Sequence, residues 1–357
     1  MPSAATTGTW GLIGPTGVTG RLVLDEALAR GHQPVLMGRD RGRLAQLAQP
    51  HGLAIRVIDA ADKAGLAAAF AGLGAVFNVA GPFAVTGRPV LEAALAARVP
   101  YLDLNGELAF LLEVLAADGA ASAAGIPLIA GAGFGVAAGD CLAAFVAAQI
   151  AAPTSLRLAV APASAYASPA VAASTVAALE FGGRRIAGGK LVSTALGDRT
   201  WNETTPDGAA LPMAAAPLAE LAALGGSTGI AEIMTGTPMP RAAARAVRLL
   251  SGGLKLVLAV PAIRRMAVRA TGHSAATSTA DAGPFVSRVW ATASNARGET
   301  VRGLLETGEG YAFAASAAVL AVERVLQGGI PAGAHTPAAA FGTDFALAIP
   351  GTTMRVL

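Results

Sequence analysis

The sequence Thr9-Trp10-Gly11-Leu12-Ile13-Gly14-Pro15-Thr16-Gly17-Val18-Thr19-Gly20 joins a short apolar run to three glycines that are spaced three residues apart. A helical pattern follows from Val18 to Arg30, and a second apolar run begins at Pro34. The order strand, glycine-rich turn, helix, strand predicts one βαβ unit. In such a unit, backbone N–H groups can approach a pyrophosphate at the positive end of the helix. The alternative is a glycine-rich turn of an ordinary α/β domain that binds nothing.

The end of the second strand indicates which nucleotide binds. An NAD site places a carboxylate there for the ribose 2′-hydroxyl, whereas this chain has Gly38-Arg39 and then Arg41 and Arg43. A planar, permanently charged guanidinium suits the extra phosphate of NADP. We interpret Asp40 as the N-cap of a helix over residues 41–49. The sequence therefore predicts NADP(H), with Arg39 as its main contact, although Arg41 and Arg43 could equally be solvated helix charges.

Composition narrows the class of protein. The 357 residues leave room for two domains, and the net charge of +3 with 14% charged residues gives no basic stripe of the kind that binds nucleic acid. The hydrophobic fraction of 54% is largely alanine, and no uninterrupted apolar run of about 20 residues predicts a membrane span. Residues 1–8 lack the features of a signal peptide, and the single cysteine allows no internal disulfide. We expect a soluble, cytoplasmic homodimer without a nucleic-acid partner.

The alternation of strands and helices continues to about residue 150. Apolar runs at 54–58, 75–79, 101–104 and 127–130 predict strands, and each is followed by a helical pattern. We therefore predict a Rossmann-type, doubly wound parallel sheet over residues 1–150, in an α/β fold. Because ligands of such sheets lie beyond the carboxyl ends of the strands, the loops after these strands should line a cofactor groove, with Asp59 near the adenine.

The pattern changes after residue 150. Residues 155–161 alternate like a strand, and Ser168-Pro169 is a strong helix start. The clearest hairpin pairs 285–294 with 299–307. We predict a second α+β domain over residues 151–308, built on a mostly antiparallel sheet and serving substrate binding and dimerisation. Residues 309–357 are expected to form a helical segment that returns to the first domain.

Residues 240–269 interleave arginines with leucines and valines. An amphipathic basic helix of this kind could contact a membrane surface or another subunit. The alternative, which we favour, is a pair of surface helices that cover the second domain.

Several motifs together resemble those of one protein family. They are the turn Gly14–Arg21, the strand end Gly38-Arg39 with Leu44, the loop Gly81-Pro82-Phe83 with Gly87, and the run Tyr101–Glu107. Looser matches follow at Thr175–Glu180, Gly188–Val192, Gly310-Tyr311 and Thr336–Gly342. The chain is similar to the saccharopine dehydrogenase-like NADP-binding oxidoreductases, and among them to the trans-acting enoyl reductases. The resemblance implies an NADP-dependent reductase and leaves the substrate open.

One stretch departs from the family. After the sixth strand the family commonly carries Gly-Phe-Asp-Ser, whereas this chain has Gly133-Phe134-Gly135-Val136-Ala137-Ala138 and keeps only the later Asp140. Polar groups near the nicotinamide are lost there, which puts shared catalytic chemistry in doubt.

The cofactor contacts follow from the turn and the strand ends. They are expected at Gly14, Thr16, Gly17, Val18, Thr19, Gly38, Arg39, Arg43, Asp59, Ala80, Gly81, Pro82, Phe83, Asp103, Gly133 and Phe134. Tyr166 is the candidate proton donor, with His273 as a second, and the histidines and cysteine show no metal-binding spacing. We expect hydride transfer from NADPH to an activated C=C or C=N bond of a largely apolar small molecule. The alternative function is a non-catalytic NADP(H)-binding scaffold or redox sensor.

Overall fold

The computed structural model describes residues 8–163, 169–258, 266–267 and 285–357. The chain divides into two compact units. The first contains residues up to Asn105 together with Phe110–Ala137 and Tyr311–Gly342; the second contains Gly106–Ala109, Ala138–Gly310 and Thr343–Leu357. The segment after residue 309 is thus shared between the units, since its helical part joins the first and its last fifteen residues join the second.

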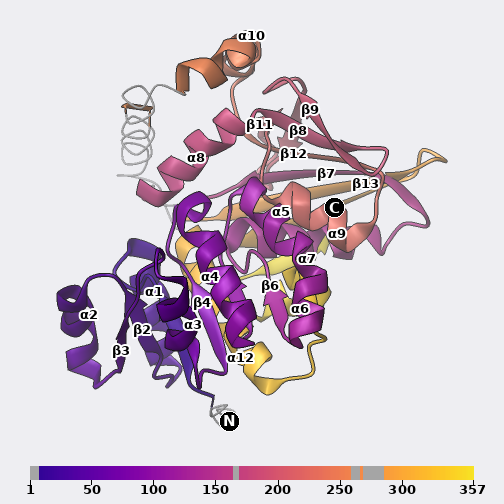
Figure 1. Ribbon diagram of the computed structural model, residues 1–357. Helices are drawn as coiled ribbons and strands as arrows, with labels where there is room; N and C mark the ends of the chain where they lie inside the picture. The colour runs from indigo at the N-terminus through magenta and orange to yellow at the C-terminus, as the bar shows by residue number, and fades with distance from the viewer. Residues whose placement is uncertain (1–7, 164–168, 259–265, 268–284) are drawn as a thin grey trace. The chain divides into compact units, whose positions relative to one another are not determined.

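A seven-stranded parallel sheet forms the centre of the first unit (Figure 1). Its strands are β1 (Trp10–Ile13), β2 (Val35–Gly38), β3 (Ile55–Val57), β4 (Ala75–Asn78), β5 (Tyr101–Asp103), β6 (Pro127–Ile129) and β15 (Gly333–His335). They lie in the order β15-β6-β5-β4-β1-β2-β3, and every pair is parallel. The order 3-2-1-4-5-6 is that of the Rossmann fold, so the predicted doubly wound sheet is confirmed.

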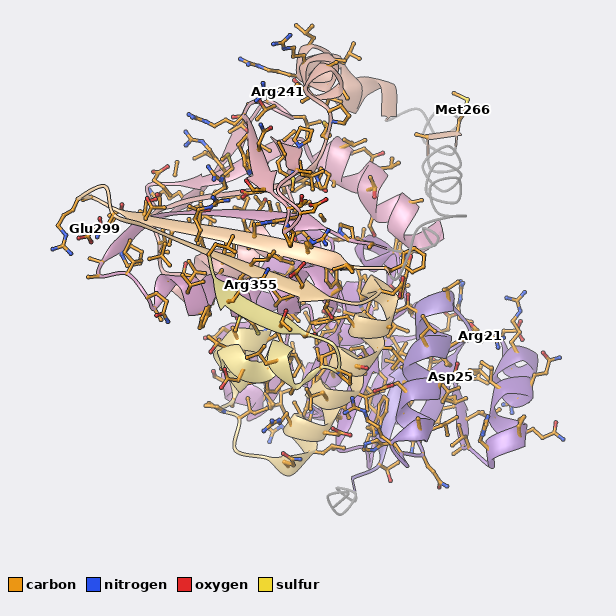
Figure 2. The ribbon with its side chains drawn as sticks, turned by 180° about the vertical axis from the view of Figure 1, so that it is seen from behind. Arg21, Asp25, Arg241, Met266, Glu299 and Arg355 are labelled. Carbon is orange, nitrogen blue, oxygen red and sulfur yellow. The ribbon has the colours of Figure 1, made fainter. Side chains whose placement is uncertain are left out.

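The helices of this unit follow its strands. They are α1 (Val18–Ala29), α2 (Arg41–Ala48), α3 (Lys63–Phe70), α4 (Phe83–Ala97), α5 (Leu108–Ala116), α6 (Asp118–Ala124), α12 (Gly310–Gln327) and α13 (Pro337–Phe341), with a 3₁₀ turn, η1, at Gln49–His51. Helix α7 (Phe134–Ala147) begins in this unit, and its residues from Ala138 belong to the second unit. Helix α1 buries Val23, Leu24 and Ala27, whereas Arg21 and Asp25 point to solvent (Figure 2). Its apolar stripe therefore fixes which side faces the sheet.

The C-terminal helix α12 is held against α1 by polar contacts. Glu323 accepts hydrogen bonds from Arg30 Nη1 at 3.2 Å and lies 3.0 Å from His32 Nε2. Ser316 Oγ donates to Glu26 at 3.0 Å, and Glu26 also pairs with Arg30 at 2.8 Å. These half-buried contacts, with the pairing of β15 to β6, bring the C-terminal segment back to the first sheet.

The second unit is built on a larger sheet. Its strands are β7 (Pro153–Ala161), β8 (Gly183–Ala187), β9 (Lys190–Thr194), β10 (Thr200–Thr204), β11 (Ala210–Ala215), β12 (Glu232–Pro238), β13 (Ser287–Asn295), β14 (Thr300–Thr307) and β16 (Thr353–Val356). The main path runs β10-β11-β12-β7-β13-β14-β16. Within the described residues β12 and β7 pair in parallel and the other pairs are antiparallel. The expected mostly antiparallel sheet is confirmed.

One face of this sheet is covered by helices. Leu158 of β7 packs at Gly139 of α7, and Gly303 of β14 lies against Leu142 and Val146 of the same helix. The remaining helices of the unit are α8 (Pro169–Phe181), α9 (Glu220–Thr228) and α10 (Arg241–Leu258), with a 3₁₀ helix, η2, at Thr343–Ala348. The β13–β14 hairpin turns at Asn295–Gly298 as the sequence predicts, and Figure 2 shows Glu299 beside that turn.

Some elements differ from the sequence-based expectation. The sequence pattern predicts helices that begin at Val90 and at Asp140, but α4 begins at Phe83 and α7 at Phe134, so both phenylalanines lie in helices instead of loops. Strand β15 was not predicted, because Gly333-Ala334-His335 has no apolar pattern. Strand β16 lies in a segment that was expected to be helical and pairs with β14. A short edge strand is stabilised by hydrogen bonds to the neighbouring strand, and the sequence of the short strand alone does not reveal that pairing.

Helix α10 carries the basic amphipathic pattern of the sequence. Arg241, Arg245 and Arg248 are exposed, and Leu249 and Leu250 are 85% and 64% exposed. Ala244 is fully buried, so one side of the helix packs on the unit (Figure 2 shows Arg241 at its start). No helix within the described residues is long and apolar enough to cross a membrane.

A buried carboxyl group lies at the start of α9. Glu220 is 6% exposed, and its side chain packs beside Gly139 of α7. Burial raises the pKa of Glu220 to about 7, and a hydrogen bond from its own backbone N–H partly opposes that shift. Because the folded pKa exceeds the ordinary value of 4.5, the folded state binds the proton more tightly than the unfolded chain does. The contribution of Glu220 to the free energy of unfolding is then most favourable below pH 4.5 and is lost as the pH rises through about 7.

We predict that Glu220→Gln removes this pH dependence. The amide keeps the shape of the protonated carboxyl and cannot ionise, so the variant should be more stable than the native protein at pH 8, by up to about 3 kcal/mol. The two proteins should unfold alike near pH 4.5. Urea unfolding followed by circular dichroism at both pH values measures the difference. An equal difference at the two pH values would contradict the assignment to the Glu220 carboxyl.

Candidate functional site

The turn between β1 and α1 is packed too closely for side chains at two of its glycines. Gly14 has φ +87°, and an added Cβ would lie 3.0 Å from the backbone of Ala80 beyond β4. A Cβ at Gly20 would collide with the carbonyl oxygen of Gly14. The Gly14 N–H donates to the carbonyl of Met37 at 2.9 Å, which ties the turn to β2. Gly14 and Gly20 therefore hold β1, α1 and β4 together.

Gly17 has a different environment. It is exposed, its backbone is extended with φ −78°, and it is the N-cap of α1 without a side chain to cap the helix. A Cβ there would lie 3.6 Å from the Gly14 carbonyl oxygen, which is an ordinary contact. The first N–H groups of α1 are thus free of side-chain capping and sit at the positive end of the helix dipole. Thr16 and Thr19 are half-buried and Val18 is 41% exposed at this turn.

The end of β2 presents exposed cations. Gly38 is half-buried, and Arg39, directly after it, is exposed and has no ion-pair partner in the described part of the chain. Asp40 caps α2, because its Oδ1 accepts from the Arg43 N–H at 3.0 Å; the predicted N-cap is confirmed. The Arg43 guanidinium lies 3.5 Å from Asp40 Oδ2, and both side chains are exposed. Within the described residues no carboxylate holds Arg39, and none holds Arg41 at the exposed start of α2.

The loop after β4 is organised by a buried asparagine. Asn78 Oδ1 accepts from the Ala80 N–H at 3.0 Å, and the Thr86 hydroxyl donates to the Ala80 carbonyl and, at 3.2 Å, to the Pro82 carbonyl. Gly81 and Pro82 are exposed and joined by a cis peptide bond. This loop lies at the carboxyl edge of the sheet beside the Gly14 turn. Asn78 was missed from the sequence, although a polar residue ending an apolar strand was its signal.

Phe83 does not face this loop. Its ring is buried and stacks on that of Phe110, with centroids 5.8 Å apart and planes at 19°. A Cβ at Gly87 would strike the same Phe110 ring, so Gly87 is small for packing reasons. The Phe83 ring therefore packs in the core, and the predicted contact of Phe83 with a cofactor stays a prediction.

Asp103 at the end of β5 is fully buried. Its Oδ1 accepts from the N–H groups of Asn105 at 3.0 Å and Gly131 at 2.8 Å, and its Oδ2 accepts from the Tyr101 hydroxyl at 2.9 Å. Asn78 Nδ2 reaches the same hydroxyl at 3.5 Å. Burial raises the pKa of Tyr101 well above its ordinary value, and the Asp103 charge adds to the shift. The Asp103 carboxylate thus joins the loops after β5 and β6, and its predicted place in the cofactor site stays a prediction.

The loop after β6 is short. The Ala132 N–H donates to the Asp103 carbonyl at 2.6 Å, and Gly133 is buried with Leu104 3.1 Å from where its Cβ would lie. Phe134 opens α7, and its half-buried ring meets that of Phe313 of α12 edge-on at 5.5 Å. The backbone of Gly133 lies at the carboxyl edge, whereas the Phe134 side chain is taken up by packing.

The remaining candidates lie elsewhere. Asp59 is exposed after β3 and accepts from the Ala61 N–H at 2.9 Å. Tyr166 and His273 lie outside the described residues. No group of three or more His, Cys, Asp or Glu side chains placed to hold a metal occurs in the part of the chain that the structure describes.

Comparisons with known proteins find an NAD(P)H-binding domain and a matching fold. Residues 14–102 match the family model of NAD(P)H-binding domains. The apo form of a histidine-tagged saccharopine dehydrogenase (L-Glu forming) from Saccharomyces cerevisiae matches over 98% of this chain and 100% of its own, with a TM-score of 0.65 and 13% identity. No curated protein matches the sequence.

Two further structures match only part of the chain. A triphenylmethane reductase from Citrobacter sp., complexed with NADP(H), is 23% identical over 34% of this chain and 48% of its own, with a TM-score of 0.28. A nucleoside-diphosphate-sugar epimerase from Pseudomonas aeruginosa is 33% identical over 27% and 33%, with a TM-score of 0.23. The match over nearly the whole chain sets the fold. This protein has the fold of a saccharopine dehydrogenase, and its residues 14–102 form an NAD(P)H-binding domain.

Proposed function

We propose that the protein is an NADPH-dependent oxidoreductase that reduces an activated C=C or C=N bond in a largely apolar small molecule. The observation that carries the proposal is the exposed, uncapped N-terminus of α1 at Gly17, next to the unpaired Arg39 at the end of β2. NADP(H) binding uses both features, because the helix N-terminus binds the pyrophosphate and the Arg39 guanidinium binds the 2′-phosphate.

The residues present fit a dinucleotide. The absence of side chains at Gly14 and Gly20 lets the turn approach β4, while Gly17 leaves open space in front of the helix amides. Thr16, Gly17, Val18 and Thr19 would bind the pyrophosphate, and Arg39 would bind the 2′-phosphate. Asp59 is exposed where an adenine would lie. The backbone of Ala80, Gly81, Pro82 and Gly133 would orient the ring at the carboxyl edge of the sheet.

NADPH supplies a hydride when it is bound, so the protein has to orient the acceptor and exclude water. Tyr101 is not suited to give a proton, since it is fully buried, donates to Asp103 and has a pKa raised well above its ordinary value. Carbonyl reduction would need a donor for the developing alkoxide. An iminium already carries its charge, and an enone can take its proton at carbon from solvent or from Tyr166. These points favour C=N and C=C over C=O.

The substrate class follows from composition. Residues 151–308 offer Arg184, Arg185 and Arg199 but are otherwise dominated by alanine, leucine and threonine, which favours a largely apolar substrate for the hydride-transfer site. The second candidate function is a non-catalytic NADP(H)-binding scaffold or redox sensor. The exposed leucines and arginines of α10 favour it, because they would suit a partner surface.

We predict that Gly17→Val abolishes NADPH binding without unfolding the protein. The new Cβ has room in the free protein, but the side chain stands where the pyrophosphate must lie. Fluorescence titration with NADPH measures the affinity, and thermal unfolding measures stability. Gly20→Ala is the matched control: its Cβ meets the Gly14 carbonyl, so this variant should lose stability. Unchanged NADPH affinity in Gly17→Val would remove the phosphate site from this turn.

We predict that Arg39→Ala lowers the preference for NADPH over NADH by ~10–150-fold, because a charge-assisted hydrogen bond contributes roughly 1.5–3 kcal/mol. NADH affinity should change little. Arg41→Ala removes the same charge two residues away from an exposed helix position and should leave the preference intact. Dissociation constants of both cofactors for the three proteins test this. An equal loss for both cofactors in Arg39→Ala would give Arg39 a structural role instead.

We predict that a screen of enones, imines and carbonyls by NADPH oxidation yields turnover with the first two classes. Deuterium from labelled NADPH should then appear on a former C=C or C=N carbon, as located by mass spectrometry. Tyr166→Phe should slow enone reduction if Tyr166 gives the proton, and full activity would exclude it from that role. Deuterium found only on carbinol carbon would overturn the bond assignment. NADPH binding without turnover of any class would favour the scaffold.

A further inference from the structure

A cavity of about 320 Å³ lies within the second unit, on the face of its sheet away from α7. Its size is that of a pocket for a small molecule. Strands β7, β12 and β13 form its floor, and β8 and the segment before β10 form its walls. None of these elements belongs to the NAD(P)H-binding domain at residues 14–102.

The floor of the cavity is set by strand register. Ser155 of β7 lies opposite Glu232 of β12 and Ser294 of β13. One row further along β7, Arg157 lies between Met234 and Thr292. Because directly opposite residues share a face, two cross-strand rows place hydroxyl groups and one guanidinium together.

Cations outnumber carboxylates around this cavity. Its lining includes Arg157, Arg185 and Arg199 but a single acid, Glu232. Glu232 is held by Arg185 Nη1 at 3.3 Å and by the Gly188 N–H at 2.8 Å. Arg199 is exposed, and within the described residues no acceptor or carboxylate holds its guanidinium. Glu232 therefore matches Arg185, whereas Arg199 brings an unmatched positive charge to the lining.

Among the three arginines of the lining, Arg157 has contacts with both an aromatic ring and a buried carboxylate. Its Cζ lies 5.3 Å from the centre of the Trp201 ring, and its Nη2 lies 3.6 Å from Oε1 of the buried Glu203. That carboxylate is also held by Arg302 at 3.0 Å and by the Trp201 indole N–H at 2.8 Å. Arg157 Nε is buried and has no hydrogen-bond partner. That atom is closed to solvent and to a ligand, but the side chain as a whole is 34% exposed, so its outer N–H groups can meet an acceptor bound at the cavity.

We propose that this cavity binds a small dianion, whose oxygens take the N–H groups of Arg157 and Arg199 while the hydroxyls of Ser155 and Thr292 complete the site. Guanidinium groups match both phosphate and carboxylate geometry, so the shared chemistry is a doubly charged oxyanion. The site is independent of nucleotide binding, since it uses residues of the second unit alone.

The test is isothermal titration calorimetry of the full chain with inorganic phosphate and, separately, with succinate. Both titrations are made at constant ionic strength in the presence of saturating NADP⁺, so that phosphate does not compete for the nucleotide turn. Arg199→Ala should weaken binding at least tenfold, since it removes a charge-assisted contact. Glu232→Gln should tighten binding, because it frees Arg185 and removes the one acid of the lining. Arg157→Gln should weaken it as well.

The matched control is Arg184→Ala. Arg184 precedes Arg185 on β8, does not line the cavity and lies over the Phe181 ring at 4.5 Å, so this variant should bind as the native protein does. Binding of phosphate alone would identify a phosphoryl ligand, and binding of succinate alone a dicarboxylate. If neither probe binds, or if Arg199→Ala binds as tightly as Arg184→Ala, the proposal is wrong. If NADP⁺ does not bind, the test remains valid, because it compares the anion affinities of the Arg199→Ala and Arg184→Ala variants with each other.

Discussion

The first unit depends on the contact between the β1–α1 turn and its own helix. Gly20 can face the carbonyl of Gly14 only because it has no Cβ, and Gly14 can approach Ala80 for the same reason. This contact brings the start of α1 down onto the ends of β1 and β4. The N-terminal amides of α1 therefore open at the carboxyl edge of the sheet, where an uncapped helix attracts an anion. The three glycines have two different roles. Gly14 and Gly20 allow the close packing of the turn, and Gly17 leaves the space in front of the N-terminal amides of α1 open.

A buried carboxylate holds the neighbouring loops in place. Asp103 would be costly to bury alone, but three donors from residues 101, 105 and 131 satisfy it. Those donors come from β5 and from the loops after β5 and β6, so the network joins the two loops at the edge of the sheet. Asp103 lies near the proposed cofactor site, and these hydrogen bonds of its carboxylate are with residues of the protein. A strand-end acid can thus position a site without contacting the ligand, and sequence position alone does not separate these roles.

The periodic parts of the chain were predictable from its sequence. The first βαβ unit, the Asp40 cap and the hairpin at 295–298 all follow from local chemistry that tertiary contacts do not override. The early starts of α4 and α7 were not predictable, because Phe83 stacks on Phe110 and Phe134 meets Phe313 edge-on, and these partners lie far away in the sequence. Strand β15 likewise exists only through its pairing with β6. The cavity arginines were visible as residues, but only the register of β7, β12 and β13 brings them together.

Unsatisfied polar groups have different meanings at different places in this fold. Trp10 Nε1 is also buried without a partner, but its ring is packed 6.3 Å from that of His32, and the indole is neutral. Glu220 can meet its burial by holding a proton, since its pKa is raised to about 7. Arg157 cannot give up its proton, and its Nε stays buried without a partner while the rest of its guanidinium lies beside Glu203 and the Trp201 ring. An anion at the cavity would therefore bind the exposed part of the Arg157 side chain, as a pyrophosphate would bind the exposed, uncapped start of α1 at Gly17 in the first unit.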